Sequence, residues 1–198
     1  MDLISLGDIL KVTLTLFTVI DIIGVLPLLI DISKNTGEIH AEKASITSLG
    51  IMLLALFLGE KFLSFLGVSK ASFAVAGGII LFILAMEMVL GRSIVKQGKK
   101  QEKASAVVPV AFPLISGAGT ITTILTLKSQ FNYFEMAIAI IINILIVYLV
   151  LRYLYLLRDK ISENTLLVMR KLFGVILLAI SVGMISKNIG NMIVWNVK

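Results

Sequence analysis

The residues in this sequence that could do chemistry inside a lipid bilayer begin with one acid. Asp21 lies within an apolar run at residues 12–30, and Gly24 and Pro27 follow it at intervals of three residues. A carboxylate at the centre of a membrane-spanning segment costs at least about 2.5 kcal/mol, so such acids commonly mark ion, proton or substrate pathways. We therefore expect Asp21 to hold an ammonium group or to carry a coupling proton.

A second cluster of small and polar residues lies in the apolar run at residues 106–127, where Pro113 precedes Ser116 and Gly117. Proline removes a backbone donor and glycine destabilises a helix, so both runs are predicted to break near the membrane midplane. A broken helix exposes amides on one side and carbonyls on the other, and two facing breaks would suit a small zwitterion. The candidate substrate-binding residues are Asp21, Gly24, Pro27, Pro113, Ser116, Gly117, Gly119 and Thr120.

The same residue types also have a purely structural interpretation, in which glycine and proline kink helices and let them pack closely. The pair Gly77-Gly78 is predicted to make such a close helix contact. Asn143 and Ser181 are predicted to cross-link helices through hydrogen bonds. Glu87 is a second candidate for proton coupling, although its position near the end of an apolar segment also suits snorkelling to the interface.

The composition excludes several kinds of site. The sequence has no cysteine and a single histidine, His40, which stands in a polar stretch. Disulfides and cysteine-ligated metals are therefore excluded, and no metal site is expected. We also expect no cofactor and no enzymatic activity, because no nucleotide loop and no nucleophile with a nearby base can be found.

The hydrophobicity of the chain indicates an integral membrane protein. Its mean hydropathy is +1.03, with 58% hydrophobic and only 15% charged residues, whereas soluble domains carry about 25% charged residues. The lengths of the apolar segments favour transmembrane helices over the short alternating strands of a barrel. Six segments can be read, at about residues 9–30, 44–59, 71–91, 106–127, 135–156 and 172–189.

The distribution of basic residues predicts the orientation. Twelve of the 18 lysines and arginines fall between segments 1 and 2, between segments 3 and 4, or from Arg152 near the end of segment 5 to the start of segment 6. Positive charge is enriched on the cytoplasmic side of membrane proteins, so both termini are predicted to lie outside. We expect a multi-pass protein of the cell inner membrane, and the net charge of +6 then needs no nucleic acid partner.

The two halves of the chain are weakly alike. Residues 115–119 resemble residues 20–24 at an offset of 95, and residues 174–177 resemble residues 78–81 at an offset of 96. Since each half holds three segments, a true repeat must be inverted across the membrane, as in secondary transporters. The predicted fold is all-α, with six transmembrane helices as two inverted three-helix repeats in one transmembrane domain, and helices 1 and 4 broken near the midplane. Repeat one covers about residues 1–92, a cytoplasmic loop about 92–105, and repeat two about 106–198.

Several motifs in this order resemble the MarC family of membrane proteins, also called UPF0056. They are Asp21-x-x-Gly24-x-x-Pro27, Gly59-x-x-x-Leu63-x-x-Leu66-Gly67-Val68-Ser69, Ala76-Gly77-Gly78-Ile79-Ile80-Leu81-Phe82 and Val108-Pro109-Val110-Ala111-Phe112-Pro113-Leu114-Ile115-Ser116-Gly117-Ala118-Gly119. The family includes a small neutral amino acid transporter, so the resemblance implies transport. The chain departs from the family pattern at Ile22 and Ala118, where the family usually has proline, and both breaks are therefore less sharply enforced.

The sequence thus favours a secondary transporter for a small neutral amino acid such as glycine or alanine, with Asp21 as the candidate for proton coupling. The expected partners are the lipid bilayer, a small solute and protons. Three alternatives remain at this stage: a non-transporting scaffold or regulatory membrane protein, an exporter of another small metabolite, and a passive channel.

Overall fold

The structure is a computed structural model that describes residues 5–36, 39–91 and 110–196, and the regular secondary structure of these residues is helical throughout. The predicted cytoplasmic loop at about 92–105 lies outside the described residues. The elements are α1 (Leu6–Ile20), α2 (Leu26–Thr36), α3 (Ala41–Phe65), α4 (Lys70–Leu90), the short π-type helix η1 (Val110–Ile115), α6 (Ala118–Leu127), α7 (Tyr133–Lys160) and α8 (Glu163–Asn196).

Among the described residues, four helices are long and apolar enough to cross a membrane. These spans are Ala41–Phe65, Lys70–Leu90, Tyr133–Leu156 and Glu163–Gly190, and Ala118–Leu127 is a shorter apolar helix. They correspond to the predicted segments 2, 3, 5 and 6. The first and fourth predicted segments are each divided into shorter helices, which confirms an all-α protein whose first and fourth segments are not continuous.

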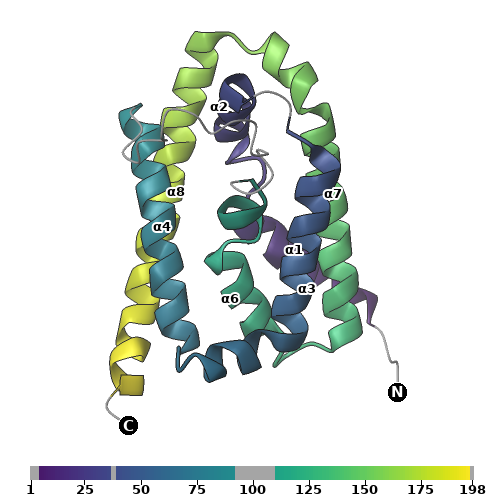
Figure 1. Ribbon diagram of the computed structural model, residues 1–198, viewed down its shortest axis with the longest axis vertical. Helices are drawn as coiled ribbons and strands as arrows, with labels where there is room; N and C mark the ends of the chain where they lie inside the picture. Colours follow the sequence, from purple (N-terminus) through teal and green to yellow (C-terminus); the bar gives the residue numbers. More distant parts are fainter. Residues whose placement is uncertain (1–4, 37–38, 92–109, 197–198) are drawn as a thin grey trace.

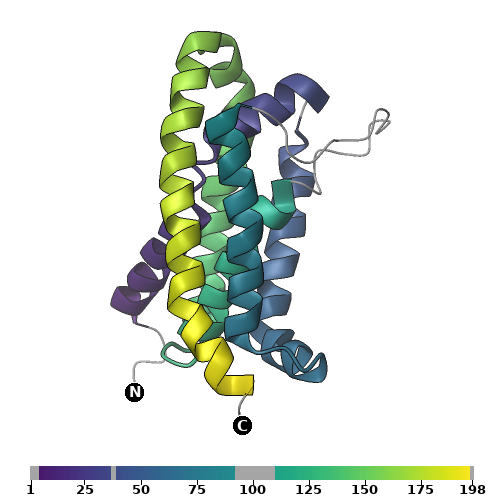
Figure 2. The same cartoon turned by 90° about the vertical axis from the view of Figure 1, so that its left-hand side faces the viewer.

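The long helices form two antiparallel pairs that flank the divided segments. Helix α4 runs along α8 on one side, and α3 runs along α7 on the other (Figure 1). Helices α2 and α6 and the short η1 lie between the pairs in this view. Figure 2 shows that α1 is inclined to the long axes of α4 and α8. Of the divided segments, α2, η1 and α6 therefore lie between the paired helices, whereas α1 packs with one face and leaves Leu6, Leu10 and Leu14 exposed.

Two glycines let α4 and α8 approach closely. A Cβ atom at Gly78 would lie 2.7 Å from Cγ1 of Ile185, and one at Gly174 would lie 2.9 Å from Cγ2 of Val89. Position 174 is the equivalent of position 78 at the repeat offset of 96, and position 185 is the equivalent of position 89. The contact of Gly174 with Val89 is therefore the repeat equivalent of the contact of Gly78 with Ile185. Close glycine contacts hold this helix pair together, as the sequence predicted for Gly78.

Polar side chains also join the helices, though not all those predicted to do so. Nδ2 of Asn143 on α7 donates to the carbonyl of Thr13 on α1 at 3.1 Å, which confirms the predicted cross-link. The backbone amide of Ser5 donates to Oε1 of Glu135, which also ties α1 to α7. Ser181 differs from the prediction, because its hydroxyl donates to the carbonyl of Leu178 in its own helix.

The two ends of the bundle are closed differently. At the end that we call the Glu60 end, the Glu60 carboxylate of α3 pairs with Lys70 at the start of α4 and, at 3.0 Å, with Lys128 just after α6. These ion pairs join three elements at one point. At the opposite end, the Arg152 end, the start of α3 and the end of α7 border a cavity of about 570 Å³.

Candidate functional site

The first break lies where the sequence predicted it, directly after α1. Asp21 has φ 45° and ψ 46°, the left-handed conformation, and its amide still donates to the carbonyl of Phe17. Asp and Asn adopt this conformation more readily than most residues, so Asp21 ends the helix locally. Helix α2 begins at Leu26, whose amide donates to the carbonyl of Ile23 at 3.2 Å. Pro27 then sits in the first turn of α2, where a proline is tolerated.

The half-buried Asp21 carboxylate is held by the turn that follows it. Its Oδ1 atom accepts a hydrogen bond from the amide of Gly24 at 3.2 Å. A Cβ atom at Gly24 would collide with both carboxylate oxygens, so only glycine lets the carboxylate fold over the turn. Gly24 therefore fixes the position of the Asp21 carboxylate. The sequence predicted only that Gly24 weakens the helix, so this role was missed.

The second break separates η1 from α6. Phe112 is extended within η1, with φ −140° and ψ 127°, and the amide of Ser116 donates to the carbonyl of Ala111 at 2.9 Å. Gly117 then precedes α6 and provides no capping side chain. The first amides of α6 thus carry the partial positive charge of an uncapped helix N-terminus. Pro113 lies in η1, and its side chain is outside the described part of the structure.

Two buried hydroxyl groups hold this second break in place. Oγ of Ser116 donates to the carbonyl of Ser48 on α3 at 3.1 Å. Oγ1 of Thr120 donates at 2.9 Å to the carbonyl of Ile115, the last residue of η1, and so gives this carbonyl a hydrogen bond where the helix is interrupted. Both protons are therefore engaged, and each oxygen retains only acceptor capacity toward a ligand.

The two breaks meet in space. A Cβ atom at Gly119, in the first turn of α6, would lie 3.8 Å from Cγ1 of Val19, two residues before Asp21. The same position is 3.5 Å from Sδ of Met184 on α8, so three elements converge there. The geometry therefore places the last turn of α1, which leads into Asp21, against the first turn of α6.

Sequence reasoning missed the contribution of α4 to this site. Gly77 packs so closely on Ala118, the first residue of α6, that a Cβ atom at Gly77 would collide with the Ala118 methyl group. The Gly77-Gly78 pair was the only available signal, and it was correctly assigned to helix packing. Its partner could not be inferred, because the register between α4 and α6 is not a local property of the sequence.

Not every candidate residue belongs to this meeting point. Glu87 lies on α4 ten residues beyond Gly77, or about 15 Å along the helix. Neither the cavity at the Arg152 end nor the groove between α3 and α7 reaches Asp21 or Ser116. Within the described ranges, no three His, Asp or Glu side chains gather in a way that could hold a metal ion.

Comparison with known proteins assigns the chain to a family. Residues 6–193 match the MarC family integral membrane proteins. A UPF0056 membrane protein of Methanocaldococcus jannaschii is 30% identical over 88% of this chain and 92% of its own. A UPF0056 membrane protein of Pyrococcus abyssi is 34% identical over 88% of this chain and 90% of its own. A UPF0056 membrane protein of Aquifex aeolicus is 30% identical over 85% of this chain and 84% of its own. No solved structure matches. This chain therefore belongs to the MarC family of integral membrane proteins, whose UPF0056 members resemble it over most of their length.

Proposed function

We propose that this protein is a secondary transporter that moves a small neutral amino acid across the cell inner membrane. The observation that carries the proposal is the contact between the two helix breaks, with Val19 beside Asp21 lying against Gly119 at the start of α6. Backbone that leaves a helix at membrane depth is tolerated only inside protein or along a water-filled path. Transporters use such breaks to bind substrates between repeats. The protein needs no enzymatic step in this role.

The chemistry of the breaks suits a zwitterion. The uncapped amides of α6 would receive the substrate carboxylate, since a helix N-terminus favours anions. The Asp21 carboxylate and the last carbonyls of α1 would receive the ammonium group, and Asp21 would also carry the coupling proton. Val19 and Met184 already lie at ordinary contact distance from the position of a Cβ atom on Gly119, so we infer a substrate with a side chain as small as that of glycine or alanine.

The two halves would form an inverted repeat around this site. The exchange of the Gly78 and Gly174 contacts by one sequence offset supports a two-fold relation between α4 and α8. The antiparallel course of α3 and α7 is also what such a relation requires (Figure 1). We propose that the Arg152 end faces the cytoplasm and that both termini lie outside, following the excess of positive charge.

Counterflow in proteoliposomes tests the proposal. Vesicles loaded with unlabelled glycine or alanine should accumulate the labelled amino acid, and Asp21→Asn and Gly119→Leu should each reduce the rate at least about tenfold. Asp8→Asn is the matched control for the acid, because Asp8 pairs with exposed Lys11. Gly50→Leu is the control for the glycine, because no atom lies within 4 Å of its added Cβ. Folded protein without flux or binding across a panel of neutral amino acids would reject the substrate class.

A reversible cross-link provides a second test, because the chain has no cysteine of its own. Val19→Cys combined with Gly119→Cys should form a disulfide, since the Cβ of position 119 lies 3.8 Å from the Val19 side chain. Transport that requires the breaks to part should stop in the cross-linked protein and return after reduction. Undiminished flux through the cross-linked form would show that this contact is not part of the pathway.

A non-transporting scaffold or regulatory protein is the second candidate. It is favoured by the engagement of the Ser116 and Thr120 hydroxyls with backbone carbonyls, which is what a purely structural break requires. Under this alternative, Asp21→Asn would lower the stability of the protein or its recovery with partners. Solute counterflow would then be absent in the unmodified protein as well.

A further inference from the structure

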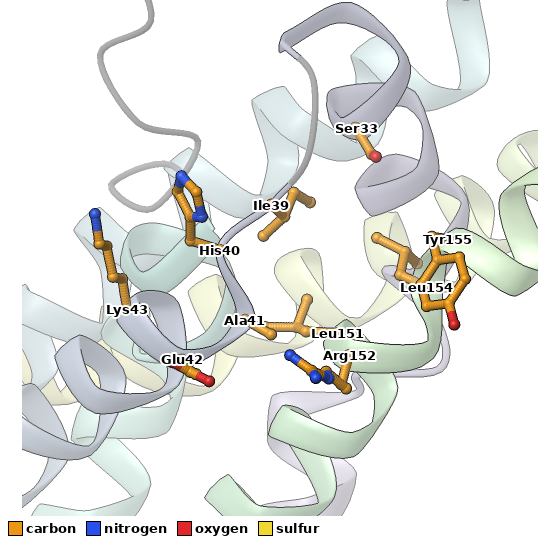
Figure 3. A pocket seen from close by; sticks show the side chains of 10 residues that line it. All are labelled: Ser33, Ile39, His40, Ala41, Glu42, Lys43, Leu151, Arg152, Leu154 and Tyr155. Atoms are coloured by element: carbon orange, nitrogen blue, oxygen red, sulfur yellow. The ribbon is translucent and has the colours of Figure 1, made fainter.

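The cavity at the Arg152 end is built for a charged group. It opens between the end of α2, the start of α3 and the end of α7, and the charged side chains around it are Glu42, Lys43 and Arg152 (Figure 3). The Glu42 carboxylate and the Arg152 guanidinium point toward one another, while Lys43 lies at the rim beside His40. Within the described part of the chain, none of the three forms an ion pair.

The backbone adds positive potential to the same cavity. His40 precedes α3 but provides no capping hydrogen bond, so the first amides of this 25-residue helix keep their partial positive charge. Together with Arg152 and Lys43, they favour a phosphate or carboxylate. Glu42 has the opposite preference and would repel a purely anionic ligand. The cavity therefore suits a group that carries both a negative charge and a primary ammonium.

An apolar groove continues from this cavity along the seam between α3 and α7. It shares Glu42 with the cavity, and its walls are Ile46, Leu49, Ile141, Ile144, Leu145 and Tyr148, together with Ser45. Ile46 and Leu145 are 69% and 56% exposed, so the groove faces outward, toward the lipid. Ile141 and Arg152 are eleven residues apart on α7, or about 16 Å, close to half of a hydrocarbon core of about 30 Å.

One hydroxyl in the groove lacks a partner. Ser45 is only 4% exposed, yet its Oγ atom makes no hydrogen bond in the structure. A serine or threonine inside a helix often donates to the carbonyl four residues earlier, as Thr15, Thr18 and Thr123 do. Thr13, Ser48 and Thr122 are unpaired like Ser45, but none of these three lines the groove. The Ser45 oxygen is covered in this structure, and a ligand in the groove with a polar group at that depth would give it a partner once the side chain turned toward the groove.

We propose that the cavity and the groove together bind one phospholipid with an ethanolamine headgroup. The phosphodiester lies against Arg152 and the first amides of α3, and the ammonium lies against Glu42. The glycerol ester accepts the hydrogen bond of Ser45, and one apolar chain follows the groove past Ile46 to Ile141. This site does not depend on the proposed transport activity, because it lies outside the meeting point of the breaks.

Native mass spectrometry of the purified protein with an equimolar mixture of ethanolamine, choline and glycerol phospholipids tests this proposal. One ethanolamine lipid should remain bound, and Arg152→Gln should reduce its occupancy about tenfold. Lys171→Gln, which removes an exposed cation of α8, is the matched control and should have no effect. Ser45→Ala should weaken binding, whereas Ser48→Ala should not, because the unpaired Ser48 hydroxyl lies outside the groove.

Glu42→Gln separates the proposal from general effects on folding. It should shift the preference from the ethanolamine lipid to the glycerol lipid, a gain of binding that a misfolded variant would not produce. If all three lipids were retained equally, and Glu42→Gln and Arg152→Gln changed nothing, the bound lipid would be ordinary annular lipid without a specific site. If water-soluble glycerophosphoethanolamine bound as well as the ethanolamine lipid, the groove would have no role in binding. If free glycine displaced the lipid, the cavity would instead be a vestibule for amino acids. Each of these results would overturn the proposal.

Discussion

The contact between Gly77 of α4 and Ala118 of α6 gives the sharpest test of how the second break is positioned. In Gly77→Ala, the new methyl group would collide with the methyl group of Ala118, and both carbons are attached directly to backbone. No rotamer change can relieve the overlap. The helices must separate by about 1–2 Å to restore normal carbon contacts near 3.5–4.0 Å. Overpacking of this kind costs about 1–3 kcal/mol, so we expect a loss of about 2 kcal/mol of unfolding free energy.

The compensating substitution makes this prediction specific. Ala118→Gly alone should cost at most about 1 kcal/mol, because glycine is a poor helix former. The double variant moves the methyl group from α6 to α4 and should regain about 1–2 kcal/mol relative to the sum of the single variants. Reversible unfolding in mixed detergent micelles measures all three free energies. Gly183→Ala is the matched control, since nothing lies within 4 Å of its added Cβ. Additive effects in the double variant would refute the contact.

Three further predictions concern the polar groups that join the elements. Glu60→Gln should lower stability by less than about 1 kcal/mol, and the effect should shrink at high salt, because the Glu60 side chain that pairs with Lys128 is 41% exposed. Asn143→Leu should cost about 0.6–1.7 kcal/mol through loss of the hydrogen bond to the Thr13 carbonyl. Thr120→Val should cost about 1–3 kcal/mol, because it leaves a buried carbonyl at the break unpaired.

Each of these predictions has a control in the same chain, measured by the same unfolding assay. The thermal unfolding curve of Glu60→Gln should lie below that of the unmodified protein at low salt and converge with it at high salt. Asn188→Leu removes only a bond to Met184 within α8 and should cost less than the Asn143 variant. Thr126→Val removes an exposed bond within α6 and should be nearly neutral. Equal losses in the control and test variants would contradict the assigned cross-links.

The helix breaks could be predicted because their signals are local. An acid followed by Gly24 and Pro27 cannot continue a regular helix in the middle of an apolar run, and Gly117 acts in the same way before α6. The replacement of the family's prolines by Ile22 and Ala118 did not remove the breaks. Asp21 in the left-handed conformation ends α1 without a following proline, and Ala118 serves as the first residue of α6.

The helix bounds show the limit of hydropathy as a signal. Segment 6 was predicted from residue 172, whereas α8 begins at Glu163, after Ser162 accepts a hydrogen bond from the amide of Thr165. Hydropathy falls where charged residues begin, but a helix continues into water as long as its backbone amides and carbonyls have hydrogen-bond partners. Helix α3 likewise reaches Phe65, although the predicted second segment ended at about residue 59.

Contacts between distant residues could not be predicted at all. The sequence identified Ser116 and Thr120 as candidates for substrate binding but gave no reason to pair Ser116 with the carbonyl of Ser48, 68 residues away. Gly24 was interpreted as a helix breaker, and its packing against the Asp21 carboxylate depends on the three-dimensional turn. The types of these residues were informative, whereas their partners depend on how the helices are set against one another.

The unequal ends of the bundle bear on the proposed transport cycle, in which only one end can be open at a time. Glu60 joins α3 to Lys70 and Lys128, so the end of α6 cannot leave α3 without breaking the pair between Lys128 and Glu60. The start of α6 is held by the contact of Gly77 with Ala118. Gly117 and the extended Phe112 lie on the η1 side of these contacts, where no regular helix resists bending. Opening the Glu60 end would therefore swing the Lys128 end of α6 about Gly117, while the uncapped amides beside this pivot would stay close to their present position.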